Sequence, residues 1–268
     1  MEYSGAHVIV TGGSSGIGRA LVGRLFERGS RVSVLALDDE DLAAVAAEYS
    51  GRGDRVTTHP VDVSESSQVR TAVAEATRIH GPCELLVTSA GISRPGHFLE
   101  LTDEHFERQM AVNYFGTLHS IRAVVPSMVE RGTGSIVAVS SAAGLLGVFG
   151  YSAYGATKYA VRGLCDVLRT ELKPKGVYVG CVYPTDVDTP QYAGERPFLP
   201  EEALSISGTV KPISADAVAV AILKGIDRQR ANIFTDSTTA ALDRLVRMAP
   251  GLTQRWLDHR VGLVTEKE

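Results

Sequence analysis

Two patterns of hydrophobic and polar residues alternate along the chain. Six short segments are mostly hydrophobic and rich in β-branched residues, which is typical of strands buried on both faces of a sheet. They span residues 7–10, 31–36, 55–58, 84–87, 135–139 and 177–182. Between them lie longer segments with helical patterns, including 18–27, 41–50, 66–80, 103–131 and 153–173. This alternation predicts an α/β fold of three layers, in which right-handed crossovers join the strands of a doubly wound parallel sheet.

The remaining pattern concerns the second half of the chain. A short strand-like segment at 232–234 predicts a seventh strand at the sheet edge. No linker or repeat divides the sequence, so we expect a single domain over residues 1–268. Within it, 190–212 mixes apolar residues with Gly and Pro and favours a mobile lid. The helical tail that follows has an apolar stripe containing Trp256, for which packing or a subunit contact is favoured over ligand binding. Packing on the lid, joining subunits and resting on an anionic membrane stay open for this tail.

Composition restricts the classes of function. The 27 basic and 31 acidic residues create no basic field for nucleic acid. Cys83, Cys165 and Cys181 show neither disulfide nor zinc-site spacing, and the histidines are scattered, so we expect buried reduced thiols and no metal. The sequence has no basic-then-apolar leader and no apolar run near the ~20 residues that a membrane span needs. These features predict a cytoplasmic protein that acts on small molecules and has no transmembrane segment.

The stretch TGGSSGIGRA at 11–20 is rich in glycine and lies between the first predicted strand and the first predicted helix. Glycine lets the backbone turn tightly there, and the N–H groups and dipole of a helix start can hold a pyrophosphate. A tight turn without a ligand is the alternative. The predicted cofactor-binding residues of this turn are Gly12, Ser14, Ser15, Gly16, Ile17 and Gly18.

Tyr154 and Lys158 are four residues apart on a predicted helix, so their side chains share one face. A free phenol has a pKa of about 10, and a neighbouring ammonium group lowers it by stabilising the phenolate. An exposed helical pair would show the same spacing. Two further residues favour a site: Ser141 follows a predicted strand 13 residues before Tyr154, and Asn113 lies in the long helix before that strand.

In order and spacing, these four residues and the glycine pattern T-G-x-x-x-G-x-G resemble the short-chain dehydrogenase/reductase family over nearly the whole chain. The resemblance implies a Rossmann-type fold and hydride transfer between a nicotinamide cofactor and a ketone or secondary alcohol. Tyr154 would be the general acid and base, and Ser141 would hold the carbonyl oxygen. Lys158 would bind the nicotinamide ribose, and Asn113 would hold a water beside it. Ser140 is expected to point away from Ser141.

The resemblance also implies further cofactor contacts. They are Leu37 after the second strand, Asp62 and Val63 near the adenine, Ser89, Ala90 and Gly91 near the ribose, and Pro184, Val187 and Thr189 near the nicotinamide. An aspartate at position 62 also fits an ordinary helix cap. The chain departs from the family pattern at Thr88 and Ser89, where asparagine is usual, and at Thr185, where glycine is usual.

The run YPTDVDTP at 183–190 is similar to one in the 3-ketodihydrosphingosine reductase branch of the family, whose members reduce a long-chain amino ketone. This branch implies a lipid-like carbonyl substrate and favours NADP(H). The residues themselves leave NAD(H) possible, because Arg19 offers a partner for a 2′-phosphate whereas Ala36 with Asp38 fits an NAD pocket.

Alternatives for the function are a general ketone or hydroxysteroid dehydrogenase and a cofactor-binding regulator without turnover. The helices predicted over 103–131 and 153–173 have more apolar positions than one sheet face needs, and they resemble the subunit contacts of the family. We therefore expect a homodimer or homotetramer.

Overall fold

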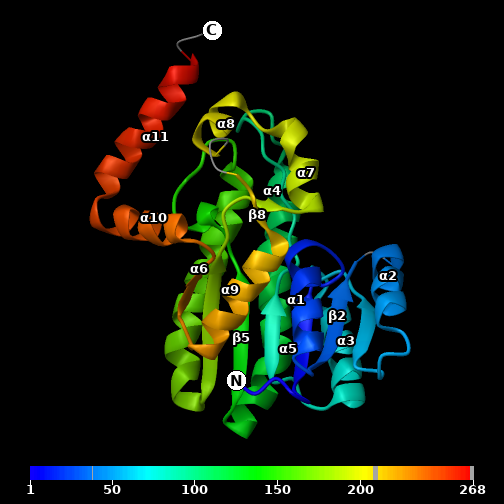
Figure 1. Ribbon diagram of the computed structural model, residues 1–268. Helices are drawn as coiled ribbons and strands as arrows, with labels where there is room; N and C mark the ends of the chain where they lie inside the picture. The colour runs from blue at the N-terminus through cyan, green and yellow to red at the C-terminus, as the bar shows by residue number, and fades with distance from the viewer. Residues whose placement is uncertain (38, 208–210, 266–268) are drawn as a thin grey trace.

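The computed structural model describes residues 1–37, 39–207 and 211–265. Its centre is a seven-stranded parallel sheet in the order β3-β2-β1-β4-β5-β6-β9 (Figure 1). The strands are β1 (His7–Thr11), β2 (Arg31–Ala36), β3 (Val56–Pro60), β4 (Leu85–Thr88), β5 (Gly134–Val139), β6 (Val177–Tyr183) and β9 (Asn232–Phe234). The predicted doubly wound sheet and its seventh edge strand are confirmed. The strand order reverses between β1 and β4, and ligands of such sheets bind at the carboxyl ends beside this point.

Two layers of helices cover the sheet. One face packs against α1 (Gly16–Glu27), α2 (Asp39–Tyr49) and α9 (Ala215–Asp227), and the other against α3 (Ser66–His80), α5 (Gly116–Arg131) and α6 (Ser152–Leu172). Successive side chains of a strand point to opposite faces. Val8 and Val10 of β1 therefore join the core under α1, whereas Ile9 joins the core under α3 and α5. Because both faces are covered, the strands are hydrophobic almost throughout, as their sequences predicted.

The single helix predicted over 103–131 is wrong in detail. The chain forms α4 (Asp103–Gln109), then a π-helix (Met110–Phe115), then α5. A π-helix adds a residue to a helical turn, and such turns occur frequently at functional sites. The hydrophobic pattern did not separate these three pieces, because they follow one another without a break and differ only in the local hydrogen bonding of the helix.

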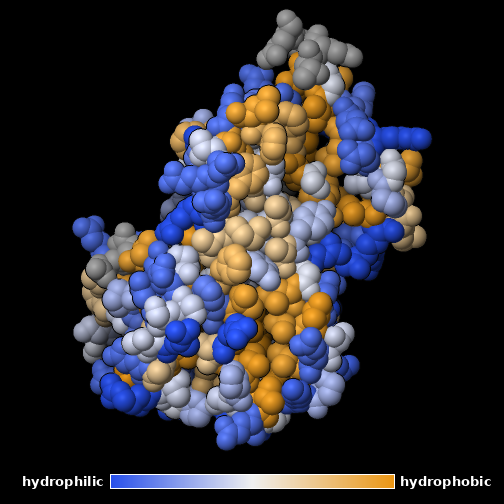
Figure 2. All heavy atoms as spheres, turned by 180° about the vertical axis from the view of Figure 1, so that it is seen from behind, coloured by the Kyte–Doolittle hydropathy of each residue, from blue (hydrophilic) through white to orange (hydrophobic). Residues whose placement is uncertain are grey.

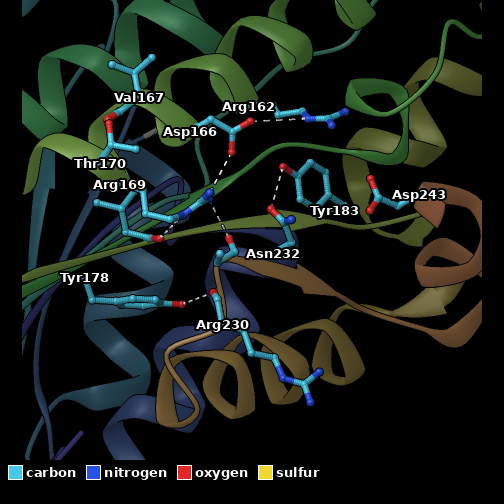
Figure 3. Close-up of polar contacts among 12 residues, drawn as sticks. Arg162, Asp166, Val167, Arg169, Thr170, Tyr178, Tyr183, Arg230, Asn232 and Asp243 are labelled. Atoms are coloured by element: carbon cyan, nitrogen blue, oxygen red, sulfur yellow. Dashed lines mark hydrogen bonds and ion pairs between the residues drawn. The ribbon is translucent and has the colours of Figure 1, made fainter. Parts of the chain in front are cut away.

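Helix α6 is hydrogen-bonded to the sheet near its β9 edge. The Arg169 guanidinium donates hydrogen bonds to the carbonyl oxygens of Val179 (3.3 Å) and Ala231 (3.1 Å), and it pairs with Asp166 at 3.0 Å (Figure 3). Val179 belongs to β6, and Ala231 comes just before β9. These contacts fix the rotation of α6 and therefore the direction in which its first two turns face.

Apart from α9 and β9, the segments that follow β6 lie toward the carboxyl ends of the strands (Figure 1). They comprise α7 (Pro190–Glu195), α8 (Glu201–Ser207), α10 (Ser237–Met248), α11 (Pro250–Thr265) and a small parallel pair of β7 (Val187–Asp188) with β8 (Ile213–Ser214). The predicted lid segment thus contains two short helices, and its residues 208–210 lie outside the described ranges. Helix α11 packs on α8, where the Arg260 guanidinium donates to the carbonyl oxygen of Ser205 and the Arg260 carbonyl accepts the Ser205 hydroxyl at 3.2 Å. The tail therefore packs on the predicted lid.

Two checks concern membranes and metals. Within the described ranges, no helix has both the length and the apolar character that crossing a bilayer requires. The same residues contain no group of three or more His, Cys, Asp or Glu side chains placed to hold a metal ion. Cys83, Cys165 and Cys181 are free and buried, which confirms the prediction of core thiols.

Candidate active site

A cavity of about 410 Å³ opens at the carboxyl ends of the central strands. Its size suits a small-molecule site, and its walls come from the loops after β1, β4, β5 and β6 and from α6, α7, α8, α10 and α11. The sequence-predicted residues that line it are Gly12, Ser15, Gly16, Ile17, Ser89, Ala90, Gly91, Ser141, Tyr154, Lys158, Pro184, Val187 and Thr189. The structure therefore brings most of the predicted site together.

Six predicted residues do not line this cavity: Ser14, Gly18, Leu37, Asp62, Val63 and Asn113. Leu37 is 62% exposed, and Asp38 lies outside the described residues. The Asp62 carboxylate accepts the backbone N–H of Ser64 at 2.9 Å and lies 3.3 Å from the Arg108 guanidinium. The N-cap position of the following helix is Glu65, so Asp62 is not its cap.

The glycine-rich turn fits a dinucleotide phosphate. Gly12 has a φ of +65°, and a Cβ there would lie 2.7 Å from the backbone of Ala90, so only glycine fits. Helix α1 begins at Gly16, and the side chain of its N-cap residue Ser15 makes no capping hydrogen bond. The first N–H groups of α1 and the Ser15 hydroxyl are thus available to an anion in the cavity.

One supporting residue of this turn was missed from the sequence. The Thr11 hydroxyl accepts the backbone N–H groups of Ser89 and Ala90, each at 3.2 Å, and thereby joins the loop after β1 to the loop after β4. Its place as the last residue of β1, directly before the glycines, was the available indication.

Lys158 is a buried cation beside Tyr154. Its Nζ donates to the carbonyl oxygen of Val139 at 3.1 Å and lies 5.3 Å from the centre of the Tyr154 ring. Burial lowers the pKa of Lys158 to about 8, so the ammonium form still predominates at neutral pH. The helical spacing of four residues therefore places phenol and ammonium in one site, as the sequence predicted.

The Tyr154 phenol is protonated at neutral pH. Burial raises its pKa most, and the nearby carboxyl of Glu195 raises it further. The neighbouring side chains of Ser141 and Gln191 act in the opposite direction. The expected lowering of this pKa by Lys158 is therefore wrong, because the effect of burial is larger than that of the neighbouring ammonium. A protonated phenol is the form that a general acid requires.

The two serines after β5 have different surroundings. The Ser140 hydroxyl is buried and donates to the backbone carbonyl of Lys158 at 2.8 Å, which holds it against α6. The Ser141 hydroxyl accepts the backbone N–H of Ala143 at 3.1 Å, so its own proton stays available to an acceptor in the cavity. This geometry favours Ser141 as the residue that meets a ligand oxygen.

Asn113 supports the site from behind the cavity wall. It lies on the π-helix, and its side-chain amide bonds both backbone groups of Ile92 and the hydroxyl of Thr157 at 2.8–3.0 Å. A Cβ on Gly91 would lie 3.2 Å from Asn113 Oδ1 and 3.6 Å from Lys158 Nζ. Asn113 and Lys158 therefore approach each other across a residue that has no side chain.

The cavity also contains residues to which the sequence analysis gave no role. Asp186, Gln191 and Glu195 line it, and so does Trp256, for which packing or a subunit contact was favoured. Burial raises the pKa of Glu195 to about 7. Gln191 and Glu195 are four residues apart, and this spacing could have placed both on one face of a helix had α7 been recognised.

Comparison with known proteins agrees with this geometry. The family model described as short chain dehydrogenase matches residues 6–198. The chain belongs to this family. A 3-ketodihydrosphingosine reductase of Bos taurus is 41% identical over 229 residues, which cover 84% of this chain and 69% of the relative.

Two solved short-chain dehydrogenases show the same fold with different cofactors. The structure from Burkholderia phymatum in complex with NAD has a TM-score of 0.84, 26% identity and coverage of 94% of this chain and 96% of its own. The structure from Burkholderia cenocepacia J2315 in complex with NADP has a TM-score of 0.80, 27% identity and coverage of 96% and 99%. Family members solved with NAD and with NADP support a nicotinamide cofactor for this chain.

Proposed function

We propose that this protein is an NAD(P)(H)-dependent reductase of long-chain 3-ketones of the 3-ketodihydrosphingosine type. The observation that carries the proposal is the position of Tyr154 beside Ser141 and Lys158 in the lining of one cavity. The similarity to 3-ketodihydrosphingosine reductases supports the substrate class.

The reaction follows from the roles of these side chains. Bound nicotinamide supplies the hydride for the carbonyl carbon. Tyr154 gives its proton to the carbonyl oxygen, so hydride and proton together convert the ketone to a secondary alcohol. The free O–H of Ser141 stabilises the negative charge that develops on this oxygen. The Lys158 ammonium would hold the nicotinamide ribose and would stabilise the phenolate left on Tyr154, and Asn113 would position a water beside Lys158.

The apolar part of the cavity lining suits an alkyl chain. It is formed by side chains of Leu146, Val148, Ile206, Leu242 and Trp256. Ile206 comes from the segment predicted as a lid, whereas Phe198 of the same segment is 46% exposed and stacks beneath the Arg94 guanidinium. An apolar lining in the cavity that contains the proton donor matches a ketone with a long hydrocarbon tail.

NADP(H) is the favoured cofactor, on the strength of the similarity to the reductase branch. Arg19 is the first basic residue of α1 after the glycine-rich turn. Its guanidinium pairs with Glu48 and donates to the carbonyl oxygen of Ser14 at 3.3 Å. To bind the 2′-phosphate of NADP(H), Arg19 must give up these two partners. Replacing the exposed Leu37 with arginine is expected to strengthen NADPH binding, because the variant adds a charged donor.

A homodimer or homotetramer is the proposed assembly. Figure 2 shows hydrophobic side chains gathered over the face that α5 and α6 cover. Phe115, Tyr159 and Val167 are 44%, 43% and 55% exposed in this region.

The free buried thiols fit a reducing compartment, so a cytoplasmic location is proposed.

Turnover assays with purified protein test this function. We expect NADPH-dependent reduction of long-chain 3-keto amino alcohols at kcat/KM values at least tenfold above those of cyclohexanone or a 3-ketosteroid. Binding of NADPH by titration calorimetry should be tighter than that of NADH. Preferred turnover of the steroid or the small ketone would instead support a general dehydrogenase, and tenfold tighter NADH binding would make the chain an NAD enzyme.

A further inference from the structure

Two carboxylates face the proposed reaction centre. Glu195 at the end of α7 and Asp186 before β7 both line the cavity that contains Tyr154. Both carboxyl groups raise the pKa of the Tyr154 phenol, so they lie within electrostatic reach of the atom that meets the carbonyl oxygen. The proposed hydride and proton transfers use neither carboxylate.

Glu195 is buried without a complete set of partners. It is 8% exposed, and its Oε2 has no hydrogen-bond partner among the described residues. The Ser93 hydroxyl lies close enough to lower the pKa of Glu195, but it does not bond to Oε2. A buried carboxylate oxygen that lacks a donor is costly to the fold, so its presence in a cavity wall suggests a donor on the ligand.

The cavity has more acidic than basic side chains around Glu195. Lys158, Asp186 and Glu195 are the charged residues of the described lining. Lys158 is engaged with Val139 and lies beside Gly91, at the proposed cofactor side. Burial raises the pKa of both Glu195 and Asp186, and the charge of Asp186 adds to the shift of Glu195. A cation between them would stabilise the ionised form of both.

We propose that Glu195, assisted by Asp186, binds the ammonium group of a 2-amino-3-ketone and thereby makes the enzyme selective for α-amino ketones over plain ketones. In such a substrate the ammonium-bearing carbon is bonded directly to the carbonyl carbon. An oxygen held by Tyr154 and Ser141 therefore brings the ammonium group to the wall that contains Glu195. The alkyl chain leaves the carbonyl carbon in the other direction, toward Leu242 and Trp256. This inference rests on the proposed function and specifies its substrate.

The substrate's ammonium group gives these carboxylates a binding and specificity role. Its three N–H donors suit the Glu195 oxygen that lacks a partner. A site built around such a charge rejects an analogue that lacks it, because the buried Glu195 carboxylate then stays incompletely paired. Glu195 and Asp186 thus determine which ketone reaches the chemistry performed by Tyr154.

A pair of ketones that differ only in the amino group tests the proposal. We would compare 2-amino-1-hydroxydecan-3-one, freshly dissolved as its hydrochloride, with 1-hydroxydecan-3-one, since ten carbons keep both below micelle formation. Wild-type kcat/KM should favour the amino ketone at least about tenfold, and Glu195→Gln should reduce that ratio at least about tenfold, mainly through KM. The matched control is Glu201→Gln, which neutralises an exposed carboxylate of α8 outside the cavity wall and should leave the ratio unchanged.

A second measurement on the wild-type protein does not depend on how any variant folds. Decylamine should inhibit wild-type turnover at concentrations at least tenfold below those of decan-1-ol. In a folded Asp186→Asn variant this difference should be smaller. Equal inhibition by amine and alcohol, or a Glu195→Gln variant that loses both ketones in proportion, would overturn the ammonium site and leave the ketone reductase in place. A wild-type enzyme that reduces neither ketone would remove the proposed function and this inference together.

Discussion

At the residue scale, the chemistry depends on how Tyr154 and Lys158 share one buried pocket. Burial acts on them in opposite directions, because it raises the pKa of the phenol and lowers that of the ammonium. Both shifts disfavour the charged forms. The phenol is therefore protonated at neutral pH. Lys158 also stays mostly protonated, because its lowered pKa of about 8 is still above 7. This state of the pair suits reduction of a ketone.

Replacing Tyr154 with phenylalanine should reduce kcat by at least about 10²-fold, the usual scale for loss of a positioned general acid. NADPH affinity should change only a few-fold, because the ring and its packing remain. Steady-state kinetics with a long-chain 3-ketone and fluorescence titration of NADPH would measure both quantities. The control is Tyr159→Phe on the same helix, whose ring is 43% exposed, and it should leave kcat unchanged. Near-normal turnover of the Tyr154 variant would remove this phenol from the mechanism.

His7 makes stability depend on pH far from the active site. The imidazole is fully buried, its Nδ1–H donates to the Gly81 carbonyl at 2.7 Å, and its Nε2 lies 3.0 Å from the Ser33 hydroxyl. Burial lowers its pKa from 6.5 to about 4. The folded protein thus holds His7 neutral, whereas the unfolded chain accepts a proton below pH 6.5.

The free energy of unfolding should therefore fall as the pH decreases from 6.5 to about 4, by about 3 kcal/mol from His7 alone. His59 and His80 also have lowered pKa values through burial and add to the same trend. Urea unfolding at several pH values would measure the slope, and His7→Gln should reduce it. A slope that is unchanged in this variant would assign the effect to other groups.

Among the candidate site residues, the sequence was sufficient to predict those that occupy characteristic positions on a helix or after a strand. Tyr154 and Lys158 are linked by a helical turn, and Ser141 by its place after a strand, so pattern and family resemblance were enough to locate them. Asp186 and Glu195 were not assigned roles, because their proximity to Tyr154 arises from the path of the chain through β7 and α7 rather than from local spacing. Trp256 reaches the cavity for the same reason.

At the scale of elements, helix α1 contains two glycines whose surroundings differ. Gly18 faces back across the turn, and a Cβ there would overlap the carbonyl oxygen of Gly12. Gly23 lies on the same helix, and a Cβ there would meet only the Tyr49 hydroxyl at 3.5 Å. Two alanine substitutions in one helix therefore have opposite expected effects.

Gly18→Ala should force the glycine-rich turn away from the helix start, with a loss of about 1–3 kcal/mol in stability and at least tenfold weaker NADPH binding. Gly23→Ala should raise the free energy of unfolding by up to about 1 kcal/mol, because alanine favours the helix and has room. Urea unfolding and NADPH titration of the two variants provide a matched comparison. Equal behaviour of both would show that the turn tolerates a side chain.

The elements that the sequence misjudged depend on tertiary geometry. The segment 103–131 was expected as one helix, but the Asn113 side chain bonds Ile92 and Thr157 from a π-helix turn that no hydrophobic periodicity encodes. The two-residue strands β7 and β8 were not expected either, because their pairing joins segments far apart in the sequence. The seven strands of the main sheet were found from short segments rich in apolar and β-branched residues, although β3 (VTTHP) is largely polar.

At the scale of the whole molecule, the apolar residues left exposed on the π-helix (Phe115) and on α6 (Tyr159 and Val167) predict self-association. Light scattering at micromolar concentration should give a dimer or tetramer mass. Val167→Glu should shift the population toward smaller species, because its side chain is 55% exposed on α6 and a charge there disfavours burial. Ile79→Glu, at a comparably exposed position on α3, is the control and should leave the mass unchanged. A monomeric wild-type protein would contradict the assembly.

The whole chain also determines how long a substrate the enzyme prefers. The reaction itself needs only a carbonyl group beside Tyr154 and Ser141, but the cavity is closed by α8, α10 and α11, which contribute Ile206, Leu242 and Trp256 to its wall. Each buried methylene is worth about 0.8 kcal/mol, so kcat/KM for a series of 2-amino-3-ketones should rise up to about fourfold per carbon until the wall is covered. Ile206→Ala should lower this slope for the longer substrates, because it removes apolar contact area from the far end of the cavity. A kcat/KM value that stays flat or falls with chain length would contradict the lipid substrate and favour a small ketone. The apolar residues of the lining would then serve only to pack the C-terminal helices against the lid segment.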